Sequence, residues 1–138
     1  IGIVQQDVFL FNGTILDNIL YGRLDATVEE VVEAAKRANI YDYIMEMPDG
    51  FLTEIGERGV RLSGGQKQRL SIARALVKDP EILILDDSLS AVDALTEANI
   101  INQLKEYRKD KTNIIVAHRF SAVQEADKII VWTHSSFP

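Results

Sequence analysis

The sequence contains no cysteine, so it can form neither a disulfide framework nor a cysteine-based zinc site. It has no run approaching the roughly 18–20 apolar residues that a membrane-spanning helix needs, and we expect no such helix in it. Its 15 basic residues are outnumbered by 21 acidic ones, and the net charge of −6 argues against a nucleic-acid-binding surface. With 138 residues, 46% of them hydrophobic, the sequence predicts one compact globular domain.

Four short runs of apolar residues predict buried strands. They cover Ile1–Val4, Ile82–Leu85, Asn113–Ala117 and Lys128–Trp132. Continuous apolar runs, rather than alternating ones, are typical of a parallel sheet that is covered on both faces. Because helical stretches lie between the last three runs, the order of elements favours an α/β domain.

Two capping patterns predict where helices begin in the first half of the chain. Thr14-x-x-Asp17 and Thr27-x-x-Glu30 each resemble a capping box, in which two side chains satisfy backbone N–H groups that the helix start leaves free. The second pattern opens a helix over Val28–Arg37.

Three more helices are expected further along. A short one covers Tyr41–Met45 before the turn Pro48-Asp49-Gly50, and a long one follows Ser63 and runs to about Val77, with Asp79-Pro80 ending it. No strand is evident in residues 14–61, which we interpret as a helical insertion between two strands of the sheet. The third helix is predicted from the helical spacing of Leu95, Ala98, Ile101 and Leu104.

Polar side chains follow three of the predicted strands at the point where each strand ends. Gln5-Gln6-Asp7 follows the first, Asp86-Asp87 the second and His118 the third. Ligands of parallel α/β sheets bind outside the carboxyl ends of the strands, so we expect these groups to meet at one edge. Amide, carboxylate and imidazole groups together suit phosphate or magnesium chemistry, which predicts a nucleotide site.

Two segments, taken one at a time, also have an interpretation that involves no nucleotide. An apolar strand that ends in Asp86-Asp87 matches the Walker B pattern, in which Asp86 holds Mg²⁺ through water, but it also fits a pair of solvated acids. Ser63-Gly64-Gly65 at a helix start exposes N–H groups to an anion, with the helix dipole in support, but most such strings are flexible turns.

The longer sequence around Gly64 and Gly65 identifies a family more specifically than the glycines alone. Leu62–Gln66 resembles the LSGGQ signature of ABC ATPases, and Lys67–Leu76 resembles the helix that follows it in that family. Gln66 stands 20 residues before Asp86, which is the family's arrangement. Three further family motifs occur in the expected order: a Q-loop at Val4–Asp7 with Gln6 as its glutamine, a D-loop at Ser90–Asp93 and an H-loop at Val116–Arg119.

Two segments resemble the exporter branch of the family. Thr53–Gly59 resembles the X-loop that precedes the signature in ABC exporters. Leu10–Ile15 resembles the exporter segment after the Q-loop, which in the family faces the coupling helices of the transmembrane domains. The alternative for Phe11 and Tyr21 is ordinary packing within the helical part.

The resemblance runs from Ile1 to about Trp132 and implies a partial P-loop NTPase-like α/β domain with an inserted ABC α-helical subdomain. In this division, residues 1–13 hold the first strand and the Q-loop. Residues 14–78 hold the helical subdomain, the X-loop and the signature helix, and residues 79–138 hold the Walker B, D-loop and H-loop part of the catalytic core.

The resemblance also implies a mechanism in which two such domains pair head to tail around ATP and Mg²⁺. At the chain's own site Gln6 and Asp86 would bind Mg²⁺, Asp87 would stand where the catalytic base is found, and His118 would contact the γ-phosphate. The alternative for His118 is an ordinary histidine at a strand end. The ATP held by the partner would be contacted by Ser63, Gly64, Gly65 and Gln66, with Asp93 in the D-loop.

Family members act with transmembrane domains, which they contact through coupling helices and to which they are often fused. The resemblance therefore implies transmembrane domains upstream and a place at the cytoplasmic face of the cell membrane. From the net charge of −6 we expect no nucleic-acid partner.

Two departures from the family pattern bear on activity. Asp87 stands where most members have glutamate, and its shorter side chain predicts a slow or degenerate site, as in heterodimeric exporters. None of the eight glycines is followed by lysine, so the sequence holds no P-loop motif, and we expect these 138 residues alone to bind ATP weakly or not at all. Two other interpretations stay open: an ABC-type ATPase of DNA repair or chromosome upkeep, and an inactive truncated remnant.

Overall fold

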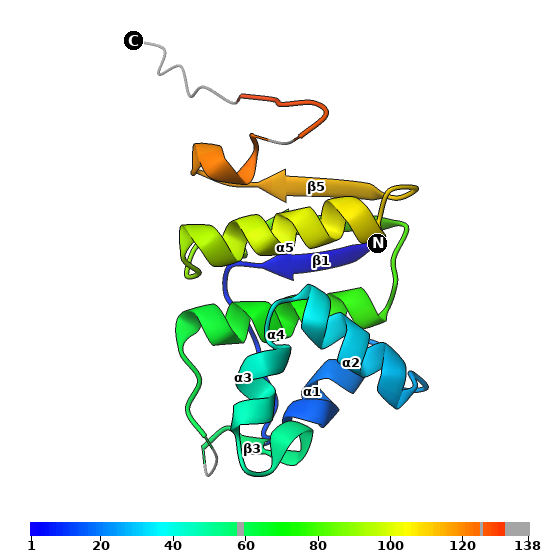
Figure 1. Cartoon of the computed structure of the whole chain (residues 1–138), viewed down its shortest axis with the longest axis vertical. Helices are drawn as coiled ribbons and strands as arrows, with labels where there is room; N and C mark the ends of the chain where they lie inside the picture. The colour runs from blue at the N-terminus through cyan, green and yellow to red at the C-terminus, as the bar shows by residue number, and fades with distance from the viewer. Residues whose placement is uncertain (58–59, 125, 132–138) are drawn as a thin grey trace.

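The computed structural model of the chain describes residues 1–57, 60–124 and 126–131. Its larger sheet contains three parallel strands in the order β1 (Gly2–Gln5), β4 (Ile82–Asp86) and β5 (Thr112–Val116). Three of the four predicted strands are thus confirmed to within one residue. Figure 1 shows this sheet above a group of short helices.

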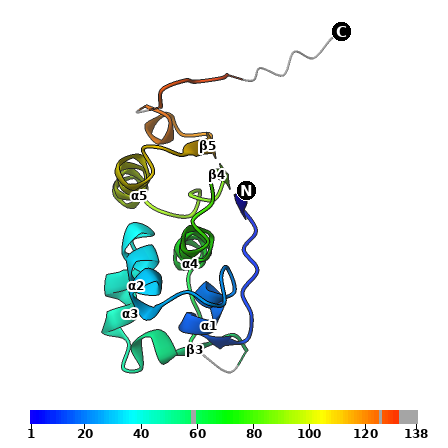
Figure 2. The same ribbon diagram turned by 90° about the vertical axis from the view of Figure 1, so that its right-hand side faces the viewer.

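Two long helices, α4 (Gly64–Val77) and α5 (Ala94–Tyr107), pack on one face of this sheet, as the turned view in Figure 2 shows. On that face Leu83 is fully buried, whereas Ile3 and Ile114 on the opposite face are 58% and 46% exposed. Our prediction of cover on both faces is therefore wrong for the described part of the chain. An apolar run indicates that both faces of a strand favour burial, but it does not identify which element covers each face.

The helical part of the molecule also contains a small sheet. Strands β2 (Gly13–Thr14) and β3 (Glu54–Ile55) pair antiparallel, so the prediction of no strand in residues 14–61 is wrong. Strands of two residues are too short to show a period of two in the sequence. They bring together the two ends of a segment that contains α1 (Ile15–Leu20), α2 (Val28–Arg37), α3 (Tyr41–Glu46) and the 3-10 helix η1 (Gly50–Leu52).

The predicted helix starts are confirmed. The Thr14 side chain accepts a hydrogen bond from the backbone of Asp17 at 3.0 Å, and the Asp17 carboxylate accepts one in return from the Thr14 backbone, which completes a capping box. Thr27 caps α2 through the backbone N–H of Glu30. Such caps stabilise a helix start by about 1 kcal/mol each.

Helix α5 packs with a different face from the one predicted. The predicted helix is present, and Ile101 and Leu104 of the predicted stripe are buried, but Leu95 is 74% exposed and Ala98 is also exposed, so half of the stripe is wrong. The spacing was ambiguous because one position of the true buried stripe is a charged residue, which a search for apolar spacing passes over. That stripe consists of Glu97, Ile100, Ile101 and Leu104.

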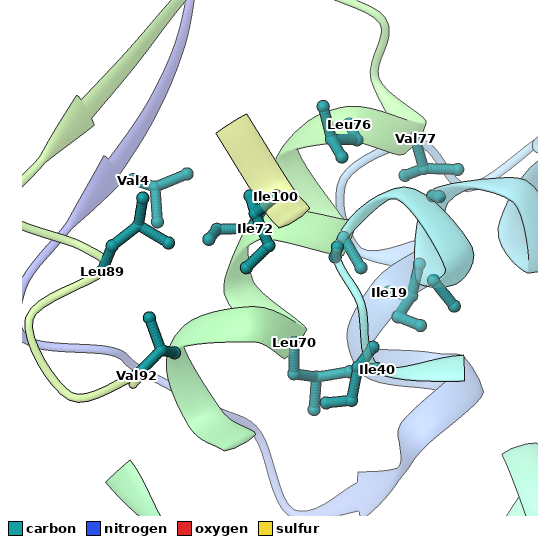
Figure 3. Packing of buried hydrophobic residues seen from close by; sticks show 14 of the residues in the cluster. Val4, Ile19, Ile40, Leu70, Ile72, Leu76, Val77, Leu89, Val92 and Ile100 are labelled. Atoms are coloured by element: carbon teal, nitrogen blue, oxygen red, sulfur yellow. The ribbon is translucent and has the colours of Figure 1, made fainter. Parts of the chain in front are cut away.

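Helix α4 lies between the sheet and the helical part and packs against both. Figure 3 shows Ile72 directed toward Ile100 of α5, whereas Leu70 is directed toward Ile40 in the helical part. Burial on two sides explains why the sequence of α4 has apolar residues around most of its circumference. The single core therefore fixes the position of the helix that begins at the signature segment Leu62–Gln66.

The last predicted strand is wrong over the residues that can be described. Residues 128–131 form no strand, and Trp132 lies outside the described residues. Ile130 is 91% exposed, so this apolar run has neither a neighbouring strand nor a covering helix in the described part of the chain. A strand requires a partner for its hydrogen bonds, which the run itself does not specify. Among the described residues, no helix combines the length and the apolar character needed to cross a membrane.

A buried arginine at the amino end of the sheet supports the fold. Arg108 is 4% exposed and donates hydrogen bonds to the carbonyl oxygen of Pro80 and the side chain of Asn113, both at 2.7 Å. Burial lowers the pKa of its guanidinium, whereas the carboxylate of Asp79 acts in the opposite direction.

Replacing Arg108 with alanine is expected to lower the free energy of unfolding by about 2–4 kcal/mol, because two acceptors lose a charged donor and a buried volume is left empty. Thermal or denaturant unfolding measures the loss. The matched control is Arg37→Ala, since Arg37 is half-exposed and lies over the Tyr107 ring, and its removal should cost under about 1 kcal/mol. Equal losses for the two variants would contradict a special role for Arg108.

Candidate functional site

The carboxyl ends of the three parallel strands meet at one edge of the sheet. Gln5, Asp86 and Val116 are direct neighbours in the strand register, so the residues that follow them start side by side. A shallow cavity of about 280 Å³ lies there. The predicted convergence of the polar groups is therefore confirmed, since the residues that line the cavity are Gln5, Gln6, Asp7, Asp86, Asp87, Val116 and His118.

The side chains of Asp87 and His118 lie beside one another at this edge. The backbone of Asp87 turns with φ at +54°, a left-handed conformation that aspartate adopts more readily than most residues. Its N–H donates to the carbonyl oxygen of Val116 at 2.9 Å, which ties the end of β4 to the end of β5. The Asp87 carboxylate lies 3.8 Å from Nε2 of His118, whose side chain is 85% exposed. An accessible imidazole beside a carboxylate can contact a ligand that enters the cavity.

The signature segment Leu62–Gln66 forms the start of α4, away from this cavity. The Ser63 side chain accepts a hydrogen bond from the Gln66 backbone, and the Gln66 side chain accepts one from the Ser63 backbone at 2.8 Å. Ser63 and Gly64 are exposed, so the positive end of the helix dipole faces solvent, as the sequence predicts. Besides the predicted contact with a partner's ATP, Gln66 has a structural role, because its side-chain oxygen is part of the helix cap.

The loop Ser88–Asp93 packs directly on the signature helix. Gln68, which is 4% exposed, donates to the Ser90 hydroxyl at 3.0 Å and accepts from the Ala91 backbone N–H at 2.8 Å. A side chain at Gly65 would place its Cβ 2.8 Å from the Ala91 carbonyl oxygen, so this glycine permits the close approach. The second glycine of the signature is thus required by the D-loop behind it, apart from any role toward a phosphate.

Asp93 ends this loop and caps α5. Its carboxylate accepts a hydrogen bond from the Thr96 backbone at 2.7 Å, and the hydrogen bonds from Thr96 lower the pKa of the Asp93 carboxyl group. The sequence predicts a nucleotide contact for Asp93. The structure adds a local role in starting the helix, and the contact stays a prediction.

The segment after the Q-loop is held by a buried amide and an arginine. Asn18 is fully buried and binds the backbone N–H and carbonyl oxygen of Phe11 at 2.8 and 3.1 Å. Arg74 of α4 donates to the carbonyl oxygens of Asn18 and Phe9 at 2.9 and 2.8 Å, and burial lowers the pKa of its guanidinium. This arginine also lies over the rings of Phe11 and Tyr21, so the aromatic residues form one cluster with it.

Sequence reasoning missed several residues that shape the site. Gln68, Arg74 and Glu97 are polar residues within helices, where the sequence alone predicts solvent exposure. Arg119 follows His118 and was included only as part of the H-loop string. Each of these four contacts residues more than 20 positions away in the sequence, so no local pattern identifies their partners.

The family model described as ABC transporter matches residues 1–90. The chain belongs to the ABC transporter family. Among relatives of this family, an "Uncharacterized ABC transporter ATP-binding protein" of Bacillus subtilis is 58% identical over 132 residues, which are 96% of this chain and 23% of that protein. A "Putative multidrug export ATP-binding/permease protein" of Staphylococcus aureus is 59% identical over 131 residues, 95% of this chain and 23% of that protein.

A solved ABC transporter structure has the same fold over most of the chain. It is described as a bacterial Atm1-family ABC exporter with ATP bound, and it matches with a TM-score of 0.85 and 50% sequence identity over 91% of this chain and 22% of that one. The partial P-loop NTPase-like α/β fold inferred from the motifs is therefore confirmed. The chain spans under a quarter of the length of these relatives.

Proposed function

We propose that the chain is part of the ATP-binding domain of an ABC exporter, which hydrolyses MgATP between two head-to-tail domains and couples the hydrolysis to export across a membrane. The observation that carries the proposal is the separation of two sets of groups. Gln6, Asp86 and His118 line one cavity at the sheet edge, whereas Ser63 lies at an exposed helix start elsewhere on the surface. A chain with both sets can serve its own nucleotide with one and a partner's nucleotide with the other.

The residues at the sheet edge fit magnesium that is shared with a nucleotide. Asp86 offers an exposed carboxylate and Gln6 an amide oxygen at the same cavity, both of which are ligand types that Mg²⁺ accepts. No group of three or more histidine, cysteine or acidic side chains in the described residues is arranged to hold a metal by itself. Mg²⁺ keeps several waters and binds phosphate oxygens, so one carboxylate and one amide suffice, and the ion would neutralise charge on the transferring phosphoryl group.

The other groups at this edge would act on the attacking water and the γ-phosphate. Asp87 occupies the position from which a carboxylate would accept a proton from the water, and His118 would place an N–H donor against the phosphate. Phosphoryl transfer depends mainly on such positioning and charge stabilisation. The ATP of the partner domain would be contacted by Ser63, Gly64, Gly65 and Gln66, and approached by Asp93.

The partners we propose are a second ATP-binding domain and transmembrane domains that belong to the same exporter at the cytoplasmic face of the membrane. Phe9 and Tyr21 are 69% and 61% exposed, which leaves aromatic surface free for a coupling helix. Arg74 joins this surface to the signature helix. The division into residues 1–13, 14–78 and 79–138 remains our proposal for the parts of the domain.

Exporter function is favoured over the two alternatives. The name of the Staphylococcus aureus relative refers to multidrug export, and the solved relative is an exporter, which supports transport rather than DNA repair or chromosome upkeep. The polar groups that gather at the sheet edge and the capped signature are two of the parts that hydrolysis would use, which supports a working exporter over an inactive remnant.

The test is MgATP hydrolysis by the full-length protein in lipid vesicles. Asp86→Asn is expected to lower the turnover at least about 100-fold, because the ligand that would hold Mg²⁺ loses its charge. The control Asp110→Asn changes an exposed aspartate in the turn between α5 and β5 and should leave turnover unchanged. Turnover that survives Asp86→Asn, or a full-length protein with no MgATP hydrolysis, would contradict the proposal.

A further inference from the structure

His118 has little in its own side chain to hold it in place. The imidazole is 85% exposed, and the acidic oxygen nearest to it, on Asp87, is 3.8 Å away. An exposed side chain can occupy several rotamers, so its useful position depends on the backbone that carries it. That backbone lies between two fixed points, one on each side.

The first fixed point is the end of β5. Val116 pairs with Asp86 in the sheet, and its carbonyl oxygen accepts the Asp87 N–H at 2.9 Å. The second fixed point is Arg119, the residue directly after His118. Its Nη2 lies 2.7 Å from the carbonyl oxygen of Leu89 and 3.0 Å from that of Val92.

The Arg119 guanidinium is also paired with a buried carboxylate. Its Nη2 lies 2.9 Å from Oε2 of Glu97, which is only 2% exposed and stands in the buried face of α5. The other carboxylate oxygen of Glu97 accepts the Ser121 hydroxyl at 2.8 Å. A buried carboxylate is costly without a cation and hydrogen-bond donors, so Glu97 strongly favours the conformation in which Arg119 and Ser121 reach it.

We propose that Arg119 is a positioning residue for His118, held in place by Glu97, so that the ion pair sets where the imidazole stands relative to Asp87. The proposal rests on the proposed function, because His118 matters only if it acts on a nucleotide at the sheet edge. Glu97 is 2% exposed and belongs to the lining of a neighbouring cavity, with Asp87 and His118, and not to the lining of the sheet-edge cavity where Gln6 and Asp86 lie. We therefore assign its effect to its ion pair with Arg119. A displacement of about 1 Å in a group that contacts the reacting atoms can cost on the order of 100-fold in rate.

The experiment measures kcat and KM for MgATP in the full-length protein. Glu97→Gln keeps the shape of the side chain but removes the charge, and it is expected to lower kcat on the order of 10-fold while KM changes less than about threefold. Arg119→Ala should lower kcat further, and Arg119→Lys should recover part of the loss. Glu33→Gln, which changes an exposed glutamate on α2, is the matched control and should leave both constants unchanged.

A double-mutant cycle separates positioning from general damage to the fold. In a His118→Ala background, adding Glu97→Gln should lower kcat less than twofold, because the group that Glu97 helps to position has been removed. An equal fold-loss in both backgrounds would show that Glu97 acts only through stability and would overturn the proposal. So would an unchanged kcat for both Glu97→Gln and Arg119→Ala in the otherwise native protein.

The kinetic results expected if the proposed function is wrong differ from those expected if only the positioning role of Arg119 is wrong. If the full-length protein hydrolyses MgATP and His118→Ala leaves kcat unchanged, the role of His118 is wrong, and the positioning of His118 loses its purpose. If His118→Ala lowers kcat strongly and the ion-pair variants do not, the proposed function stands and the role of Arg119 alone is overturned.

Discussion

Replacing Asp87 with glutamate is expected to raise the MgATP turnover of the full-length protein by about 10-fold to 100-fold. The Asp87 carboxylate lies at the sheet edge beside His118, and we propose it as the catalytic base. One added methylene extends the carboxylate by roughly 1–1.5 Å, which brings a base that is too short within hydrogen-bond range of the water. An error of that size accounts for on the order of 100-fold in rate.

Replacing Asp87 with glutamate also strains the backbone, but this effect is smaller than the expected gain in turnover. Asp87 has a φ of +54°, and glutamate adopts this left-handed conformation less readily than aspartate. The strain amounts to about 1 kcal/mol and acts on the stability of the folded protein, not on the reach of the side chain. The gain in reach should therefore dominate the measured turnover.

Steady-state phosphate release with saturating MgATP measures the effect. Asp87→Asn, which has the shape of the native residue and no basic oxygen, is the matched variant and should lower turnover below the native rate. Asp110→Glu lengthens an aspartate at the other end of the sheet and should change nothing. No gain from Asp87→Glu would mean that the length of this side chain does not limit the reaction.

Replacing Gly22 with alanine is expected to destabilise the protein by about 3 kcal/mol or more. Gly22 follows α1 and packs against α4, where an added Cβ would overlap the carbonyl oxygen of Arg74 and lie 3.0 Å from its carbonyl carbon and 3.1 Å from Val77 Cγ1. The two nearest atoms belong to the backbone of a buried helix, so they cannot rotate away. Relief requires α1 to move off α4, which separates two parts of one core.

Gly64→Ala is the steric control for this prediction. A Cβ at Gly64 would lie at an ordinary distance of 3.4 Å from the Ala91 side chain, and alanine favours the helix more than glycine does. Its unfolding midpoint should stay close to the native one, whereas that of Gly22→Ala should fall by several degrees or the variant should fail to accumulate. A native-like midpoint for Gly22→Ala would show that α1 can shift without loss of packing.

Local sequence patterns predict those helices and strands that are determined by interactions between residues close together in the sequence. The helix starts at Thr14, Thr27 and Ser63 follow from short-range hydrogen bonds within one turn, and the structure has all three. Three strands follow from apolar runs that are long enough to be distinctive. Half of the predicted stripe of α5 was misplaced because the buried stripe contains Glu97, whose charge is paired with Arg119 and whose carboxylate accepts the Ser121 hydroxyl.

In the candidate site, too, some residues could be predicted from local sequence and others could not. Gln6, Asp86 and His118 could be predicted to meet because parallel strands put their carboxyl ends on one edge, and the structure brings these residues together. The residues that hold them could not be predicted. Gln68 and Arg119 contact the loop between β4 and α5 across 20 or more positions, and those pairings exist only after the chain has folded.

The 14 residues of α4 make a stiff rod that is about 21 Å long at 1.5 Å per residue. It carries the signature at its first turn, Gln68 against the D-loop one turn later, and Arg74 against the aromatic cluster near its far end. Because an α-helix resists bending, a tilt imposed at the first turn must reach the aromatic surface as a displacement of comparable size. The helix is packed at its middle in the core around Ile72, so a tilt of its first turn would displace the two ends in opposite directions about that point.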